Sequence, residues 1–207
     1  MKEYHKIQSV FKRETKNKGR IIEGSFSTQE IEFLKDNVWE WTEKLDGTCT
    51  RMMLQEGKIS YGGKTDESQI PARLVQHLRE KFDPMVGELV TMFPEGVCFY
   101  GEGCGAKIQK NGELYGDTQF VLFDVKVGTW WLSRDSVEDV ATKLALPVAP
   151  VIGEGTIAEM VEKVRRGITS QWGDFEAEGI VARPKTELHT RAGQRIITKL
   201  KTKDFRP

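Results

Sequence analysis

A lysine near the end of a predicted strand has the clearest potential for covalent chemistry. Lys44 lies in the segment Trp41–Thr48 and is followed by Asp46 and Gly47. Because side chains alternate along a strand, we expect Lys44 and Asp46 to share one face. A deprotonated amine can attack a phosphate, and burial, nearby cations or a bound metal can lower its pKa enough for this. Lys-x-Asp-Gly alone is common in surface turns, so the segment is informative only together with others.

Four further segments follow in order and contribute acids, an aromatic ring and a pair of cations. One acid lies between two glycines, which let a ligand approach closely. The two late lysines are two residues apart, so they share a strand face. The residues are Glu102, Phe123, Asp124, Glu178, Lys199 and Lys201. Together with Lys44 they are the groups needed to bind a nucleoside triphosphate with a divalent metal and to transfer its phosphoryl centre.

These ordered segments resemble motifs I, III, IIIa, IV and V of the covalent nucleotidyltransferases, which include DNA ligases, RNA ligases and mRNA capping enzymes. The matching segments are 44–47, 100–102, 122–125, 178–181 and 199–201. The residues of segments 43–48, 101–110 and 199–205 are similar to the corresponding motif sequences of the RNA ligase 2-like group. The resemblance covers about residues 38 to 205, nearly the whole chain.

The resemblance implies an ATP-dependent RNA ligase that acts in three steps. Lys44 would attack the α-phosphate of ATP, release pyrophosphate and form a lysyl-AMP phosphoramidate. The AMP would pass to an RNA 5′-phosphate, and an RNA 3′-hydroxyl would then displace AMP. The expected partners are RNA ends or a nicked RNA duplex.

The resemblance also implies how the nucleotide is bound. Glu43 lies where the family's backbone contacts adenine. Glu102 would hold the ribose hydroxyls, and Phe123 would stack on the adenine, a type of contact worth about 1–3 kcal/mol. Lys199 and Lys201 would neutralise the phosphates.

A divalent metal, Mg²⁺ or Mn²⁺, is the implied cofactor beside ATP. Glu178 would coordinate or orient the ion. Asp46 and Asp124 would be metal-linked or supporting acids.

The chain departs from the family pattern after the lysine. Many members carry Arg or Asn five residues on, where this chain has Cys49. Either Arg51 supplies that contact from the same strand face, or the contact is missing. Lys64 in the following hairpin is a second candidate for a phosphate, although a lysine lacks the bidentate fork of the commoner arginine.

The elements that must position these residues are short strands with a few helices. Strands are predicted at 39–45, 49–54, 58–62, 97–101, 119–127, 179–183 and 195–200. Helices are predicted at 71–82, 135–144 and 156–166, the second capped by Ser133 or Asp135 and the last by a capping box of Thr156 and Glu159. Many strands with segregated helices indicate an α+β fold of antiparallel sheets flanked by helices.

Composition narrows the function classes. The number of basic residues, 31, equals the number of acidic residues, so the net charge is zero. This excludes a protein that binds nucleic acid through a large net positive charge. Residues 1–20 are locally basic, and we expect either a solvated arm or a nucleic-acid contact there. No apolar run approaches the length of a membrane span, no signal peptide is visible, and three cysteines without C-x-x-C spacing favour a cytoplasmic protein.

We expect residues 1–207 to form a single nucleotidyltransferase domain. Larger relatives continue after the last motif into an OB-fold or a helical domain, which is not expected here. The rival enzymes, a DNA nick ligase and a capping guanylyltransferase, usually need that OB-fold. A catalytically inactive module that binds nucleic-acid ends is the rival from another class, and the complete set of motif residues argues against it.

Overall fold

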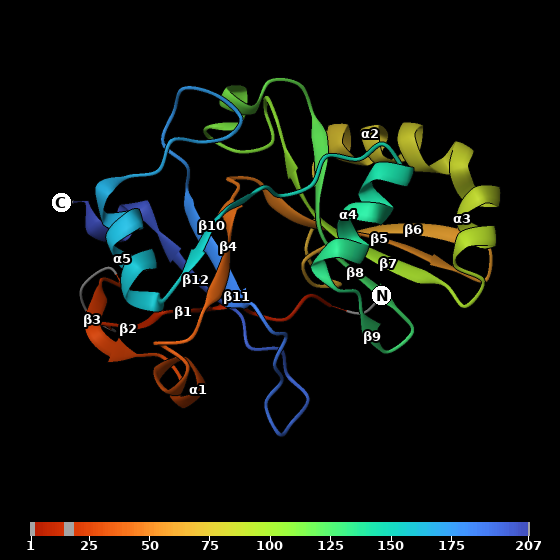
Figure 1. Ribbon diagram of the computed structural model, residues 1–207. Helices are drawn as coiled ribbons and strands as arrows, with labels where there is room; N and C mark the ends of the chain where they lie inside the picture. Colours follow the sequence, from red (N-terminus) through yellow and green to blue (C-terminus); the bar gives the residue numbers. More distant parts are fainter. Residues whose placement is uncertain (1–2, 15–18, 207) are drawn as a thin grey trace. The chain divides into compact units, whose positions relative to one another are not determined.

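The computed structural model describes residues 3–14 and 19–206, and the chain folds as two compact units (Figure 1). Unit 1 comprises the residues up to His5 together with Asp46–Ala149. Unit 2 comprises Lys6–Leu45 together with Pro150–Pro207. Within the described ranges, no helix has the length and apolar character that crossing a membrane requires.

Unit 1 is built on an antiparallel sheet of five strands in the order β6-β5-β7-β8-β9. The strands are β5 (Thr48–Gln55), β6 (Lys58–Gly63), β7 (Val97–Cys104), β8 (Gln119–Val127) and β9 (Trp130–Trp131). The helices are α2 (Ala72–Phe82), α3 (Val86–Met92) and α4 (Arg134–Lys143), with 3-10 turns η1 (Asp83–Met85) and η2 (Gly112–Tyr115). The β5–β6 hairpin turns through Glu56 and Gly57, whose φ angles of 51° and 70° suit a tight hairpin turn.

One face of the unit 1 sheet packs against its helices, as strand alternation requires. Met52 pairs with Phe99 and Leu54 with Val97, and all four side chains point into the same core. The buried core comprises Met52, Leu54, Leu74, Leu78, Phe82, Leu89, Val97, Phe99, Phe120, Leu122, Val125, Val137 and Val140. Each such side chain contributes roughly 1.5–3 kcal/mol when fully buried. The alternate residues of the same strands therefore lie on the face away from the helices.

A β-bulge interrupts this alternation in β8. Tyr100 pairs with Asp124 but the next residue, Gly101, pairs with Leu122, so Phe123 is an extra residue in the strand. Bulges re-aim side chains and recur next to functional sites. Here the bulge leaves Phe123 partly exposed while Leu122 stays in the core.

Unit 2 has a second five-stranded sheet in the order β1-β12-β11-β4-β10. The strands are β1 (Gln8–Ser9), β4 (Trp39–Lys44), β10 (Val151–Gly155), β11 (Gly179–Pro184) and β12 (Thr198–Lys201). Only the β1–β12 pairing is parallel among the described pairs of this sheet. A separate pair is formed by β2 (Phe11–Arg13) and β3 (Ile21–Phe26), and the helices are α1 (Gln29–Phe33), α5 (Ile157–Arg166) and the 3-10 turn η3 (Thr202–Phe205).

Helix α5 covers one face of this sheet and contacts β10, β11 and β12 (Figure 1). Its predicted capping box is confirmed: the Thr156 hydroxyl accepts a bond from the Glu159 amide, and the Glu159 carboxylate accepts one from the Thr156 amide. The core under α5 comprises Trp39, Trp41, Ile157, Met160, Val161, Val164, Ile180, Ala182 and Leu200. In β4, β11 and β12 these are alternate residues, so their neighbours point to the other face.

The predicted α+β class with largely antiparallel sheets is confirmed. The predicted strands all appear, but the last is shorter than expected and begins at Thr198. The three predicted helices appear, and Ser133 rather than Asp135 caps α4. The elements that the sequence pattern missed are short or glycine-containing: β1, β2, β3, β9, β10, α1 and α3.

The expectation of a solvated N-terminal arm is wrong at residues 9–11, which are buried, whereas Lys12 and Arg13 are exposed. The alternative expectation, a nucleic-acid contact, stays a prediction. Val10 and Phe11 are buried in the unit 2 core. The two short strands beside them, β1 and β2, pair with β12 and β3 and hold this segment against the core. Arg13 donates two hydrogen bonds of 2.8 Å to Asp204. Three of the predicted basic residues, Lys2, Lys16 and Lys18, lie outside the described residues.

The close approach of β11 and β12 gives a test of this packing. Gly179 has a φ of 154°, and a Cβ added there would lie 2.1 Å from the Leu200 carbonyl oxygen. We expect Gly179→Ala to lower the free energy of unfolding by at least about 2 kcal/mol, since backbone must shift to admit the methyl group. Gly87→Ala in α3, where nothing lies within 4 Å, is the control and should be neutral or stabilising. Urea denaturation followed by circular dichroism measures both, and equal stability of the two variants would contradict the packing described.

Candidate functional site

A row of three paired residues crosses strands β4, β11 and β12 of unit 2, with a lysine at each end of the row. Lys44 at the end of β4 pairs with Gly179 at the start of β11, and Gly179 pairs with Lys201 at the end of β12. The two lysines lie on the sheet face away from α5, because their neighbours Glu43 and Leu200 are buried on the other side. Adjacent strands are about 4.8 Å apart, so the two lysine backbones are separated by roughly 10 Å.

Glu178 bridges the two lysines of this row. Its Oε2 accepts a hydrogen bond from Lys44 Nζ at 2.5 Å, and its Oε1 accepts one from Lys201 Nζ at 2.5 Å. The side chains of Lys44, Glu178 and Lys201 are 18%, 17% and 24% exposed, so each can be reached from solvent. We call Lys44, Glu178 and Lys201 the lysine–carboxylate cluster.

The electrostatics of this cluster keep Glu178 ionised. Burial alone would raise the pKa of Glu178, but the ammonium groups of Lys44 and Lys201 together outweigh burial and hold that pKa below its ordinary value. The cluster therefore places two basic side chains around one ionised carboxylate, an arrangement that suits a phosphate ligand.

Lys199 lies on the same face of β12 as Lys201. It pairs with Val181, which in turn pairs with Thr42 of β4. The predicted pair of cations on one strand face, Lys199 and Lys201, is therefore present in unit 2 beside the predicted nucleophile.

Glu43 lies on the opposite face from Lys44, as the alternation of β4 dictates. Its side chain is 2% exposed, and it accepts hydrogen bonds from the Ser170 hydroxyl at 2.5 Å and from the Gln171 amide at 2.8 Å. The carboxylate therefore fixes the loop after α5 to β4. Ser170 and Gln171 were not identified from the sequence, since more than 120 residues separate them from Glu43.

The expectation that Asp46 shares a strand face with Lys44 is wrong, because β4 ends at Lys44 and alternation does not continue beyond it. The Asp46 amide donates to the Tyr115 hydroxyl at 3.0 Å, and its carboxylate accepts from Asn111 at 3.3 Å. Both partners lie in or beside η2, so the segment 105–117 holds the turn that carries Asp46.

In unit 1, the remaining predicted residues of β5, β7 and β8 gather on the sheet face away from the helices. Arg51, Tyr100 and Asp124 are neighbours across three strands, and Glu102 lies two residues beyond Tyr100 on the same face. Phe123 joins them through the β8 bulge. Strand alternation thus places apolar side chains on the helix side and the chemically active side chains on the other.

Arg51 is completely buried in the structure. Its Nε donates to the Gly63 carbonyl at 2.5 Å and its Nη2 to Asp66 at 2.9 Å. Both partners flank Lys64, so the guanidinium braces the turn that carries Lys64. A direct contact of Arg51 or Lys64 with phosphate stays a prediction.

Tyr4 belongs to the same group of side chains, although no sequence motif includes it. Its hydroxyl donates to Asp124 Oδ2 at 2.5 Å, and both side chains are buried. The two residues are 120 positions apart, and no local pattern in the sequence connects them. Tyr4 also contacts the ring of Phe123, with centroids 5.2 Å apart.

The cysteines of β7 are not suited to act as nucleophiles. Burial first, and then the charge of Glu102, raise the pKa of Cys104 to about 12, so its thiol stays protonated near neutral pH. Burial also raises the pKa of Cys98. Cys104 is fully buried and fills space in the interior as a small residue.

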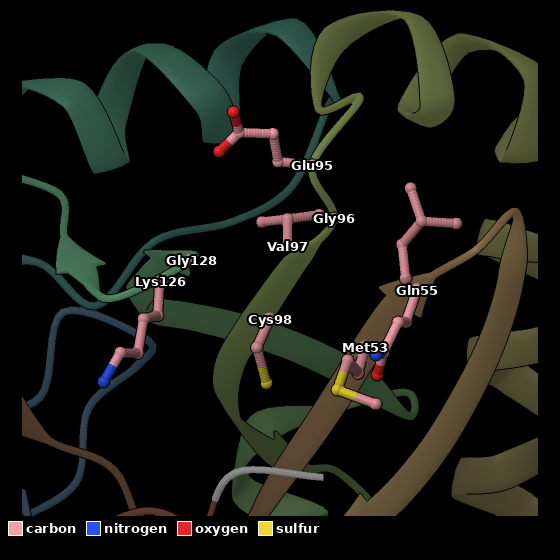
Figure 2. Close-up of a pocket in the computed structure, with 9 residues that line it drawn as sticks. Met53, Gln55, Glu95, Gly96, Val97, Cys98, Lys126 and Gly128 are labelled. Carbon is pink, nitrogen blue, oxygen red and sulfur yellow. The ribbon is translucent and has the colours of Figure 1, made fainter.

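A pocket of about 310 Å³ in unit 1 is separate from the predicted site residues. Met53 and Gln55 of β5, Glu95–Cys98 around the start of β7, and Lys126 and Gly128 at the end of β8 line it (Figure 2). None of the predicted catalytic, nucleotide-binding or metal-binding residues is among its lining residues.

Comparison with known proteins identifies a family and similar solved structures. A protein-family model described as RNA ligase matches residues 37–201. The comparison with curated proteins finds no match.

The similar solved structures are of an RNA ligase from Naegleria gruberi. The structure with pyrophosphate has a TM-score of 0.64 and 19% sequence identity, and the match covers 85% of this chain and 52% of that one. A variant with ATP and Mn has a TM-score of 0.65 and 18% sequence identity, and the match covers 85% of this chain and 53% of that one. A variant with AMP and Mn has the same TM-score and identity, and the match covers 86% of this chain and 53% of that one. The fold is therefore shared, and the chain spans about half the length of these structures.

The depressed pKa of Glu178 predicts how acid affects stability. A carboxylate whose pKa is lower in the folded state stabilises the protein above its unfolded value of 4.5, and this contribution is lost as pH falls through the folded value. At pH 7 we expect Glu178→Gln to lower the free energy of unfolding by about 1–3 kcal/mol, the typical cost of a lost partner for a buried polar group. The difference from wild type should shrink below pH 4. Urea unfolding of both proteins across pH 3 to 7 checks this, and a difference that is constant with pH would refute the ionised bridge.

Proposed function

Because the chain belongs to the RNA ligase family, we propose that it is an ATP-dependent RNA ligase, which joins RNA 3′-hydroxyl and 5′-phosphate ends through a lysyl-AMP intermediate. The match of the family model over residues 37–201 supports the family membership. The observation that carries the mechanism is the lysine–carboxylate cluster, in which Glu178 holds Lys44 and Lys201 on one face of a sheet.

In the first step the Lys44 amine attacks the α-phosphorus of ATP. An N–P bond forms, the bond to the bridging oxygen breaks, and pyrophosphate leaves. Lys44 needs a free electron pair, so its ammonium group must lose a proton before attack. Glu178 orients the Lys44 amine, and its depressed pKa makes it a persistent carboxylate rather than a strong base.

The next steps transfer the adenylyl group to RNA and then release it. An oxygen of the RNA 5′-phosphate replaces Lys44 on the phosphorus, which restores the lysine. The 3′-hydroxyl of the other end then attacks the activated 5′-phosphate, and AMP leaves. Lys199 and Lys201 neutralise charge on the phosphates in these steps.

The nucleoside is bound by residues of β7 and β8. Glu102 accepts hydrogen bonds from the ribose hydroxyls, and Phe123 stacks on the adenine. The β8 bulge supports this role for Phe123, because it takes the ring out of the core and leaves it partly exposed. Glu43 contributes through its backbone, since its carboxylate is engaged by Ser170 and Gln171.

A divalent metal fits this chemistry, and Glu178 is the residue that would hold it. No group of three or more His, Cys, Asp or Glu side chains suited to a metal occurs within the described ranges, 3–14 and 19–206. One carboxylate is nevertheless sufficient for Mg²⁺ or Mn²⁺, which commonly takes its other ligands from substrate phosphates and water. The ion would neutralise phosphate charge. Asp46 and Asp124 act as supporting acids in this proposal.

The solved relatives support the nucleotide and metal, since they contain ATP with Mn and AMP with Mn. RNA ends or a nicked RNA duplex are the substrates we propose. A DNA nick ligase and a capping guanylyltransferase share the same covalent chemistry, and substrate assays separate them from an RNA ligase.

Covalent labelling tests the nucleophile. With α-labelled ATP and Mg²⁺ the protein should acquire an acid-labile label, and Lys44→Ala should reduce it by at least about a thousandfold, as loss of a catalytic nucleophile usually does. The matched control is Lys185→Ala, an exposed lysine of unit 2 that pairs with Glu154 and should keep full labelling. Persistent label in Lys44→Ala would remove Lys44 from its role, and labelling by GTP instead of ATP would favour a capping enzyme.

Sealing assays test the substrate. Nicked duplexes that differ only in whether the 3′-hydroxyl strand is RNA or DNA should be sealed faster with RNA, by about tenfold or more if the site reads a 2′-hydroxyl. Gel analysis of single-turnover reactions measures the two rates. Equal rates would contradict an RNA specialist, and covalent labelling without any sealing would favour a module that only transfers AMP.

A further inference from the structure

We infer that Tyr4 is a positioning residue for the nucleotide-binding residues of unit 1. The inference rests on the proposed function, because Phe123, Asp124 and Lys64 have their roles from it. Tyr4 contacts each of these three residues, two through its side chain and one through its backbone.

The hydroxyl of Tyr4 fixes the carboxylate beside the β8 bulge. It donates to Asp124 Oδ2 at 2.5 Å, and Tyr4 and Asp124 are 6% and 0% exposed. A hydrogen bond to a buried carboxyl group is costly to lose, because water cannot replace the donor. The backbone that follows Phe123 is therefore tied to the N-terminal segment.

The ring of Tyr4 packs against the side chain proposed to stack on adenine. Its centroid lies 5.2 Å from that of Phe123 at an interplanar angle of 69°, an edge-to-face contact. The rings of Tyr100 and Trp131 also contact the Tyr4 ring, and their centroids lie 5.1 and 5.9 Å from the Tyr4 centroid. Since Phe123 is the extra residue of a bulge and lacks a regular place in the sheet, Tyr4 restricts the orientations that its ring can take.

The backbone of the same segment holds the turn that carries Lys64. The Tyr4 amide donates to the Lys64 carbonyl at 3.3 Å, and the Glu3 carboxylate accepts from the Asp66 amide at 2.9 Å. Buried Arg51 braces this turn from inside through Gly63 and Asp66. The segment 3–5 thus connects the turn at 63–66 with the bulge at 122–124.

Positioning predicts an effect on nucleotide binding rather than on the attacking amine. We expect Tyr4→Phe, which keeps the ring and removes the donor to Asp124, to raise the KM for ATP in lysyl-AMP formation by about tenfold, with a smaller change in kcat. Tyr4→Ala, which also removes the edge-to-face contact, should raise KM further. Protein freed of bound AMP by pyrophosphate, with labelled ATP as the probe, provides the measurement.

The matched control is Tyr61→Phe. The Tyr61 hydroxyl also donates to an aspartate of unit 1, Asp83 at 2.7 Å, but neither residue belongs to the proposed site. This variant should lose some stability and keep the KM of wild type. If Tyr4→Phe loses stability without a change in KM, as Tyr61→Phe should, Tyr4 is merely structural and the inference is overturned.

A double-mutant cycle tests whether Tyr4 acts through Phe123. In a Phe123→Ala background, Tyr4→Ala should change KM much less than in wild type, because the ring that it orients is gone. Independent effects would overturn this. If Tyr4→Ala does not fold, Tyr4→Phe decides alone by its KM. Absence of label on wild-type protein would instead refute the proposed ligase, so the two failures are distinguishable.

Discussion

Glu178 lies between two ammonium groups, and the arrangement of unit 2 depends on this one carboxylate. Lys44 and Lys201 come from strands that are far apart in the sequence and are separated in the sheet by β11 alone. Glu178 offsets the repulsion between their like charges, while backbone pairing of β4, β11 and β12 sets the row itself. Gly179 allows the three strands to close up at this point, since a larger residue would meet the Leu200 carbonyl. The places of Lys44 and Lys201 are thus set by strand register, with Glu178 between them.

The same rule of alternation sorts the side chains of both sheets. Most side chains of the two cores face the helices, and most charged residues of the predicted site face away from them. Two positions need a further explanation. Glu43 is a charged residue on the helix side of its sheet, and Ser170 and Gln171 satisfy its carboxylate there. Phe123 is an aromatic residue kept out of the core by a bulge. Glu43 thereby binds Ser170 and Gln171, and Phe123 contacts Tyr4 instead of packing in the core.

Much of this organisation could be predicted from the sequence, since strands, capping residues and turn residues act locally. The strand that carries Lys44, the capping box at Thr156 and the neighbouring strands predicted at 49–54 and 58–62 are such cases. The face of Asp46 could not be predicted, because alternation holds only as far as the strand extends. The partners of Glu43 and Asp124 could not be predicted either, because more than a hundred residues separate them and only the folded chain brings them together.

The division of the chain has a consequence for synthesis on the ribosome. Strand β4 carries Lys44, but its neighbours β10 and β11 lie beyond Ala149, after the whole of unit 1 in the sequence. Chains grow at about 5–20 residues per second, and domains generally fold as units during growth. Unit 1 can therefore complete its sheet while Trp39 and Trp41 still lack the strands and the helix that bury them. The two tryptophans of β4 therefore stay without their core partners for several seconds of synthesis, and the segment that holds Lys44 reaches its final packing late.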